Sequence, residues 1–211
     1  MVKAPIVKEG YIYILFMLII AFITFWLYDW WFLFPFAVMC FLAFFFRNPN
    51  RDIPEIDDLI VSPADGMVMS VNEVFEEEYL NEYAMRVTIF LSVFDVHINR
   101  SPISGVICYQ QYTCGRFKAA FLKSVGWENE RLSIGIDNGK TRILVTQIAG
   151  LLARRIVSWV TLGNNIAKGT RYGMIKFGSC TELTMPLTVE LFVKKGDKVR
   201  GGETIIGRIK Q

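Results

Sequence analysis

The feature that most constrains this chain is a pair of long apolar runs near its start. Residues 11–28 and 30–46 contain no charged side chain, and Asp29 alone separates them. At 1.5 Å per helical residue each run would extend about 26 Å, slightly less than the roughly 30 Å hydrocarbon core of a bilayer. We therefore expect an N-terminal hydrophobic helical hairpin that anchors the chain in a membrane.

Residues around the two runs predict how the hairpin is oriented. Basic side chains flank it at both ends, which places both ends on the cytoplasmic side by the positive-inside rule (Lys3, Lys8, Arg47 and Arg51). The tryptophans at the turn, Trp30 and Trp31, suit the opposite interface. A signal peptide is the competing interpretation, but no small-residue cleavage site follows the first run. The short runs leave open whether the hairpin spans the bilayer or only dips into it.

Composition argues against several other classes of protein. Hydrophobic residues make up 53% of the 211 residues, but the excess lies in the two apolar runs. The net charge is only +3 and the basic residues are scattered, so no nucleic-acid partner is expected. The four cysteines form no Cys-X-X-Cys pair, so we expect reduced thiols, with neither a disulfide framework nor a bound metal.

A second domain begins after the apolar runs, where residues 46–54 contain two prolines. We assign residues 1–50 to the hairpin and its junction, and residues 51–211 to a separate domain. Short runs of branched and aromatic residues then alternate with Gly, Pro and Asn, which predicts strands (around residue 61 and at 67–74, 85–91, 131–136, 142–148, 154–159 and 187–193). The domain is therefore expected to be β-rich, either all-β or α+β.

Four shorter segments refine this expectation. Asp137-Asn138-Gly139 predicts a hairpin turn between two of the strands. Residues 62–71 and 192–207 look like two halves of one barrel-sandwich, and the second half is similar to biotinyl and lipoyl domains but lacks the Met-Lys or Asp-Lys-Ala context of their attachment lysine. The acidic residues 76–82 are expected to be solvated, and residues 116–125 to form a loop or a short helix.

Acid–base chemistry near neutral pH must depend on His97, because the chain contains no other histidine. If this segment is extended, Asp95, His97 and Asn99 face one way and the residues between them face the other.

Ser179, in the Gly178-Ser179 step, is the candidate nucleophile. A serine hydroxyl attacks only when a base takes its proton, and an imidazole base needs a carboxylate to hold its tautomer. Asp65 and Asp95 are both candidates for this carboxylate, and their spacing does not choose between them.

An ordered set of motifs resembles the short, prokaryotic form of phosphatidylserine decarboxylase, a pyruvoyl-dependent enzyme that is made as a self-cleaving proenzyme. The motifs run in family order over nearly the whole chain, which makes the set specific although each motif alone is weak (residues 45–51, 62–66, 90–105, 129–131, 147–150, 153–156 and 171–179).

The resemblance implies a function for each candidate residue. Gly178-Ser179 corresponds to the self-cleavage site, His97 to the family histidine, and Asp65 to the carboxylate partner of that histidine. Ser179 would be consumed and would become the covalent pyruvoyl cofactor. Cleavage would leave a β chain of residues 1–178 and an α chain from residue 179 onward, which the resemblance implies stay associated.

The resemblance also implies the reaction and its location. In the family, the pyruvoyl group forms a Schiff base with phosphatidylserine and acts as the electron sink while CO₂ leaves, which gives phosphatidylethanolamine. We expect residues 51–211 to carry out this reaction on the cytoplasmic face of the cell membrane.

Other functions are compatible with the same residues. Archaetidylserine or another serine-headed lipid could replace phosphatidylserine as the substrate. A serine hydrolase would use Ser179 without self-cleavage, and a non-catalytic, membrane-anchored barrel-sandwich module would only bind a partner. The sequence also leaves open a homo-oligomer and the basic residues that bind the lipid phosphate.

Overall fold

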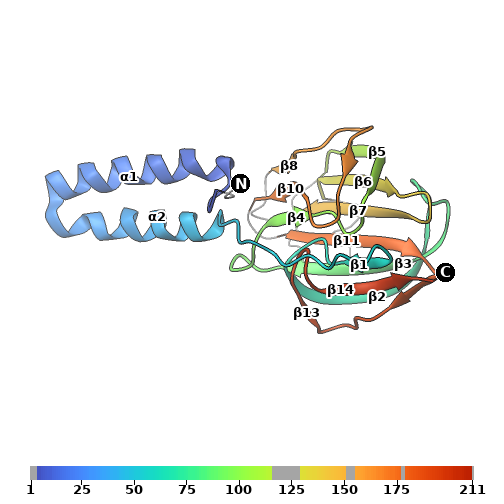
Figure 1. Cartoon of the computed structure of the whole chain (residues 1–211). Coiled ribbons are helices and arrows are strands. Elements are labelled where there is room, and N and C mark those ends of the chain that lie inside the picture. The colour runs from blue at the N-terminus through green and yellow to red at the C-terminus, as the bar shows by residue number, and fades with distance from the viewer. Residues whose placement is uncertain (1–3, 116–128, 151–154, 177–178, 211) are drawn as a thin grey trace. The chain divides into compact units, whose positions relative to one another are not determined.

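The computed structural model describes residues 4–115, 129–150, 155–176 and 179–210. The chain divides into two compact units, residues 1–50 and residues 51–211. The first unit consists of helices, and the second, called the β domain below, consists of strands (Figure 1).

The first unit is the expected helical hairpin. Helix α1 (Lys8–Tyr28) and helix α2 (Leu33–Phe45) lie side by side and are joined by a short 3₁₀ helix, η1 (Asp29–Phe32) (Figure 1). The chain turns at Asp29, whose φ of +50° is uncommon for residues other than glycine.

The two chain segments at the open end of the hairpin are bonded to each other. The N–H of Val7 donates to the backbone oxygen of Phe46 at 3.0 Å, and the side-chain amide of Asn48 donates to the backbone oxygen of Ala4 at 3.0 Å. Gly10 permits this approach, because a Cβ atom there would lie 2.6 Å from the Phe46 side chain. The hairpin is thus closed at both ends.

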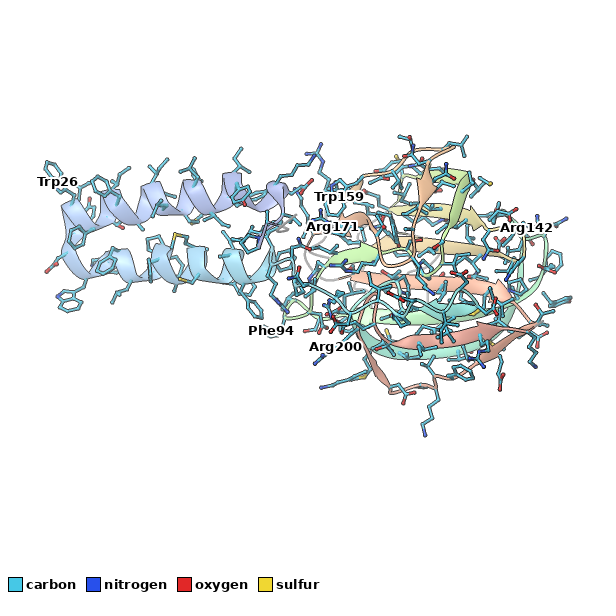
Figure 2. The ribbon with its side chains drawn as sticks, viewed as in Figure 1. Trp26, Phe94, Arg142, Trp159, Arg171 and Arg200 are labelled. Carbon is cyan, nitrogen blue, oxygen red and sulfur yellow. The ribbon has the colours of Figure 1, made fainter. Side chains whose placement is uncertain are left out.

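Large apolar side chains of the hairpin point outward. Phe22 is 70% exposed and Trp26 is 81% exposed, and Figure 2 shows Trp26 directed away from the helices. By length and composition, the helical stretch Lys8–Phe45 is long and apolar enough to cross a membrane. Large apolar side chains exposed in this way are typical of a segment that is surrounded by lipid.

The β domain is built on one antiparallel sheet of eight strands, in the order β13-β2-β3-β11-β7-β6-β5-β9 (Figure 1). These strands are β2 (Gly66–Glu76), β3 (Glu82–Leu91), β5 (Gly105–Thr113), β6 (Arg131–Asp137), β7 (Arg142–Ala149), β9 (Asn165–Ile166), β11 (Ser179–Pro186) and β13 (Lys198–Val199). The β-rich class predicted from the sequence is therefore confirmed.

Two three-stranded sheets complete the domain. One has the order β1-β14-β12 and the other the order β4-β10-β8. Their bounds are β1 (Leu59–Val61), β14 (Ile205–Ile209), β12 (Val189–Leu191), β4 (Ile98–Arg100), β10 (Arg171–Ile175) and β8 (Ile156–Ser158). Strand β7 is buried at every position after its first residue. Because successive side chains point to opposite faces, the centre of the large sheet is covered on both sides.

Two local predictions are confirmed. The Asn138-Gly139 turn joins β6 to β7, with Gly139 at φ +79°. Residues 62–71 and 192–207 lie side by side, because β13 pairs with the start of β2 and the N–H of Ser62 donates to the backbone oxygen of Thr204 at 2.8 Å.

The prediction of a wholly solvated acidic segment at residues 76–82 is wrong at its first residue. Glu76 is buried, and its carboxylate accepts hydrogen bonds from the N–H groups of Tyr79 at 2.9 Å and Leu80 at 2.6 Å. The carboxylate therefore closes the turn between β2 and β3. Residues 116–125, predicted as a loop or a short helix, lie outside the described residues.

Candidate active site

Ser179 is the first residue of β11, and its side chain is enclosed in the interior. It lies opposite Leu91 of β3 on one side and Ala149 of β7 on the other. The side chain is fully buried, and its Oγ has no hydrogen-bond partner among the described residues. A buried hydroxyl without a partner is costly, so it indicates a role other than packing. Gly178, the other half of the predicted cleavage step, lies outside the described residues.

His97 comes directly before β4 and is also fully buried. Its Nδ1 lies 3.0 Å from the backbone oxygen of Asp95. Because a carbonyl oxygen can only accept, Nδ1 carries the hydrogen and donates it. In the neutral imidazole, Nε2 is then the nitrogen that can take up a proton. The backbone of Asp95 thus selects the tautomer that a general base needs.

The carboxylate of Asp95 serves the turn before His97. It accepts from the N–H of Ser92 at 2.8 Å, and the N–H of Asp95 donates back to the Ser92 oxygen at 2.9 Å. The extended conformation considered for residues 95–99 therefore applies only to its second half. Asp95 contributes to the site through its carbonyl group.

Two hydrogen bonds show that the segment that carries His97 lies close to the segment that carries Ser179. The N–H of Ile175 donates to the backbone oxygen of His97 at 3.2 Å, and Ser179 follows Ile175 by only four residues. Two residues further along each strand, the amide of Asn99 donates to the hydroxyl of Thr181 at 2.9 Å. Side chains two residues apart share one face. These contacts bring the side chains of His97 and Ser179 to the same end of the interior.

The turn that carries Asp65 packs against the same end of the sheet. Gly66 has φ +151°, and a Cβ atom there would lie 2.0 Å from the backbone oxygen of Phe90. Only glycine therefore allows the turn to approach β3 so closely. Phe90 precedes Leu91, which is the strand partner of Ser179.

The Asp65 carboxylate is held by two neighbours. Arg51 Nη2 lies 2.7 Å from Oδ2, and the N–H of Gly201 donates to Oδ1 at 2.8 Å. Arg51 also pairs with Glu203 at 3.3 Å. The structure thus places Asp65 in a largely buried ion-pair cluster beside the site, and the relay from Asp65 to His97 stays a prediction.

Sequence reasoning gave no role to Arg100, a buried cation at this end of the domain. Its guanidinium donates to the backbone oxygen of Gly169 at 3.0 Å. Burial, with the nearby charges of Arg51 and Arg171, lowers the pKa of Arg100 to about 10, so Arg100 stays charged at neutral pH. Arg171 lies over the ring of Trp159, 5.7 Å from its centroid (Figure 2). The available signal was an arginine inside the motif around His97, in which residues 96–103 are all buried.

The thiol next to Ser179 is not a competing nucleophile. Cys180 lies on the other face of β11, where it packs with Ile148. Burial raises the pKa of the Cys180 thiol well above its usual range. Because the thiolate is the reactive form, Cys180 is chemically inert at neutral pH.

Comparison with known proteins places the chain in a family. The model of the family "Phosphatidylserine decarboxylase" matches residues 38–207. The chain belongs to the phosphatidylserine decarboxylase family. It is 48% identical to the phosphatidylserine decarboxylase proenzyme of Carboxydothermus hydrogenoformans, over 99% of each chain. It is 51% identical to that of Symbiobacterium thermophilum, over 81% of this chain and 80% of the relative.

Membership of the phosphatidylserine decarboxylase family confirms the resemblance seen in the motifs. A third relative, the proenzyme of Syntrophus aciditrophicus, is 44% identical over 85% of this chain and 84% of its own. The chain is therefore a decarboxylase, a carboxy-lyase, and the non-catalytic module and the serine hydrolase considered from the sequence do not agree with this membership.

Proposed function

We propose that this decarboxylase converts phosphatidylserine into phosphatidylethanolamine and CO₂, after it has cut its own chain between Gly178 and Ser179. The observation that carries the proposal is the buried Ser179 hydroxyl, which has no partner among the described residues and lies at the strand end that His97 reaches. Membership of the family, and the word proenzyme in the names of the relatives, also support it.

Self-cleavage begins when Ser179 Oγ attacks the carbonyl carbon of Gly178. His97 Nε2 takes the hydroxyl proton, since Nδ1 is committed to the Asp95 oxygen. The peptide C–N bond breaks, the released nitrogen is protonated, and an ester joins Gly178 to the Ser179 oxygen. Loss of the Cα hydrogen and of the Gly178 carboxylate leaves dehydroalanine, which takes up water and releases ammonia to give the pyruvoyl group.

The surroundings of Ser179 fit a pyruvoyl group. Leu91 and Ala149 flank the position, and both are fully buried and apolar. A pyruvoyl carbonyl there would supply the electron sink that decarboxylation of an amino acid needs. His97 returns a proton to the carbon that CO₂ has left, because an imidazole can both take up and give back a proton and the chain has no other histidine.

The two products of cleavage should stay together. The α chain from residue 179 onward supplies β11, β12, β13 and β14. Strand β11 lies between β3 and β7, while β14 pairs with β1 and β13 pairs with β2. These strand pairings cross the proposed cut at several places, so association does not depend on the peptide bond.

The hairpin suits the proposed substrate. A two-tailed phospholipid stays in the bilayer, so the enzyme must be held at the bilayer surface. The apolar helices provide this anchor, and the basic residues at both ends of the hairpin favour the cytoplasmic side for the β domain.

The proposal is tested with purified full-length protein added to vesicles that contain phosphatidylserine. We expect phosphatidylethanolamine by mass spectrometry, and Ser179→Ala should be both uncleaved and inactive. Ser133→Ala is the matched control, because Ser133 is equally buried but bonds to Thr146 on the neighbouring strand. Parallel vesicles with an ether-linked serine lipid separate the substrate alternatives. Formation of phosphatidylethanolamine by an intact chain would contradict the proposed mechanism.

A further inference from the structure

Three fully buried polar side chains form a hydrogen-bonded network beside the proposed active site. Asn99 of β4 donates through Nδ2 to Thr181 Oγ1 of β11 at 2.9 Å. Gln147 of β7 donates through Nε2 to Asn99 Oδ1 at 2.7 Å. All three side chains are fully buried. Asn99 thus joins a strand of one sheet to two neighbouring strands of another.

The network lies two residues along each strand from the residues proposed to react. Asn99 follows His97 by two residues, and Thr181 follows Ser179 by two residues, so each pair shares a strand face. Gln147 is the strand partner of Thr181 across β7 and β11. The Asn99–Thr181 bond is therefore a tie between the strand that carries the base and the strand that carries the nucleophile.

The same stretch of β4 is tied to the turn that carries Asp65. The N–H of Arg100 donates to the backbone oxygen of Pro63 at 2.9 Å, and the Asn99 amide lies 3.4 Å from the same oxygen. Pro63 precedes Asp65 by two residues. Residues 99 and 100 thus connect to all three segments that bear a candidate residue.

Strand β10 passes close to the side-chain amide of Gln147. A Cβ atom at Gly173 would lie 2.9 Å from Gln147 Oε1 and 3.0 Å from Nε2. Glycine at position 173 therefore leaves the room that the amide occupies. Gln147 Oε1 has no hydrogen-bond partner among the described residues, so its contact with Asn99 is what holds the amide in place.

Packing alone does not account for these three residues. Apolar side chains of similar volume would fill the space without the desolvation cost of two amides and a hydroxyl. A buried polar network does specify one relative position of the strands, because a slip by one residue moves each side chain to the opposite face. Such a slip would separate His97 from Ser179.

We infer that Asn99 is a positioning residue of this decarboxylase, which acts through Thr181 and Gln147 to hold the His97 strand in register with the Ser179 strand. The inference rests on the proposed self-cleavage and goes beyond it, because it assigns to a side chain without acid–base chemistry the alignment of the base with the nucleophile. It also explains why the interior at this point is polar.

The experiment compares two buried threonines whose hydroxyl groups bond to different strands. Thr181→Val removes the acceptor for Asn99 with little change in volume. Thr146→Val is the matched control. Thr146 of β7 is also buried, but its hydroxyl bonds to Ser133 of β6, a strand that does not pair with β11. Thr181→Ser restores the hydroxyl. Self-cleavage is followed in newly translated chains, counting only the folded, protease-resistant fraction.

We expect Thr181→Val to slow cleavage by about a hundredfold, the effect of a misplacement of about 1 Å between reacting groups. Thr181→Ser should recover most of the rate, and Thr146→Val should cleave like the wild type even where its Tm falls. Mature Thr181→Val enzyme should lose kcat with KM unchanged, since His97 also acts in turnover.

Equal cleavage rates in folded Thr181→Val and wild-type chains would overturn the role of Asn99. If Thr181→Val does not fold, Gln147→Met tests the same network, because it removes the donor to Asn99 at similar length, and a wild-type rate would again overturn the inference. A wild-type chain that never cleaves would instead contradict the proposed function itself, together with everything that rests on it.

Discussion

The hairpin and the β domain depart from the usual pattern of burial in opposite directions. In the hairpin, large apolar side chains such as Phe22 and Trp26 are exposed. In the β domain, polar side chains such as His97, Asn99 and Ser179 are fully buried. Exposed apolar surface and buried polar groups are both costly in an ordinary soluble protein.

Each departure needs its own compensation, and the compensation indicates the function. The apolar surface of α1 and α2 is compensated when lipid replaces water around it. The buried polar groups are compensated in part by their bonds to one another, and the Ser179 hydroxyl, which has no partner among the described residues, is the atom that we propose reacts. Ile89 and Val145, buried aliphatic residues of the same sheet, follow the ordinary rule and only support the site.

The largest expected effect is that of His97→Ala. Removal of the base should slow self-cleavage by about 10²- to 10⁴-fold, so the precursor should accumulate intact. The ratio of precursor to product on a denaturing gel measures this directly. Normal cleavage in the folded variant would show that the buried histidine is a packing residue. The buried polar groups of the β domain would then not indicate its function.

A second pair of variants separates the two possible roles of Asp65. Asp65→Asn and Arg51→Met both break the same ion pair, and each should lower Tm. If Asp65 supports His97, only Asp65→Asn should also slow cleavage, by about a hundredfold or more. Cleavage rates that fall equally in both variants would assign Asp65 a purely structural role.

The hairpin half of the comparison is tested by Phe22→Asp. A charge near the middle of a membrane helix costs about 2.5–3.5 kcal/mol, so the fraction that sediments with membranes should fall by tenfold or more. Self-cleavage should be unchanged, because α1 and the β domain belong to separate compact units. Phe22→Leu is the control. Unaltered sedimentation of the aspartate variant would mean that the apolar surface does not meet lipid.

The smallest expected effect concerns Glu182, a partly buried carboxyl of β11 on the face opposite Ser179. Burial raises the pKa of Glu182, and its ion pair with Arg86 at 3.6 Å offsets this only in part. The unfolded chain therefore releases this proton at lower pH than the folded chain, so stability is lost as pH rises above the usual glutamate range. Glu182→Gln removes this loss.

The measurement for Glu182 is Tm as a function of pH. The Tm of Glu182→Gln should rise relative to the wild type between acidic and neutral pH, and the exposed Glu190→Gln is measured beside it as the control for loss of a surface carboxyl. A difference in Tm that is constant with pH would contradict the prediction.

Strand prediction succeeded where the buried residues of a strand are apolar, as in most proteins. The runs that became β2, β3, β6 and β7 are rich in branched residues, and the turn at Asn138-Gly139 has its own local chemistry. Strands β10 and β11 were missed, because Gly173 lies inside the first and the second has polar residues such as Thr181 and Thr184 where a buried strand usually has apolar ones.

From the sequence we could name the proposed reactive residues, but not the residues that support them. His97 and Ser179 are recognisable by residue type and by the motifs around them. The bonds of Asn99 reach Thr181 and Gln147, which are 82 and 48 residues away in the chain. No local pattern encodes such contacts, and they follow only from the way the sheets pack.

The central claim is that Ser179 is consumed to make the cofactor, and the intact mass of the purified, denatured protein tests it most directly. We predict two chains, one ending at Gly178 and one from residue 179 onward, with the second lighter than a serine-initiated chain by the mass of ammonia. That second chain should react with a carbonyl reagent and resist Edman degradation. A single full-length chain, or a fragment that begins with an unmodified serine, would contradict the claim.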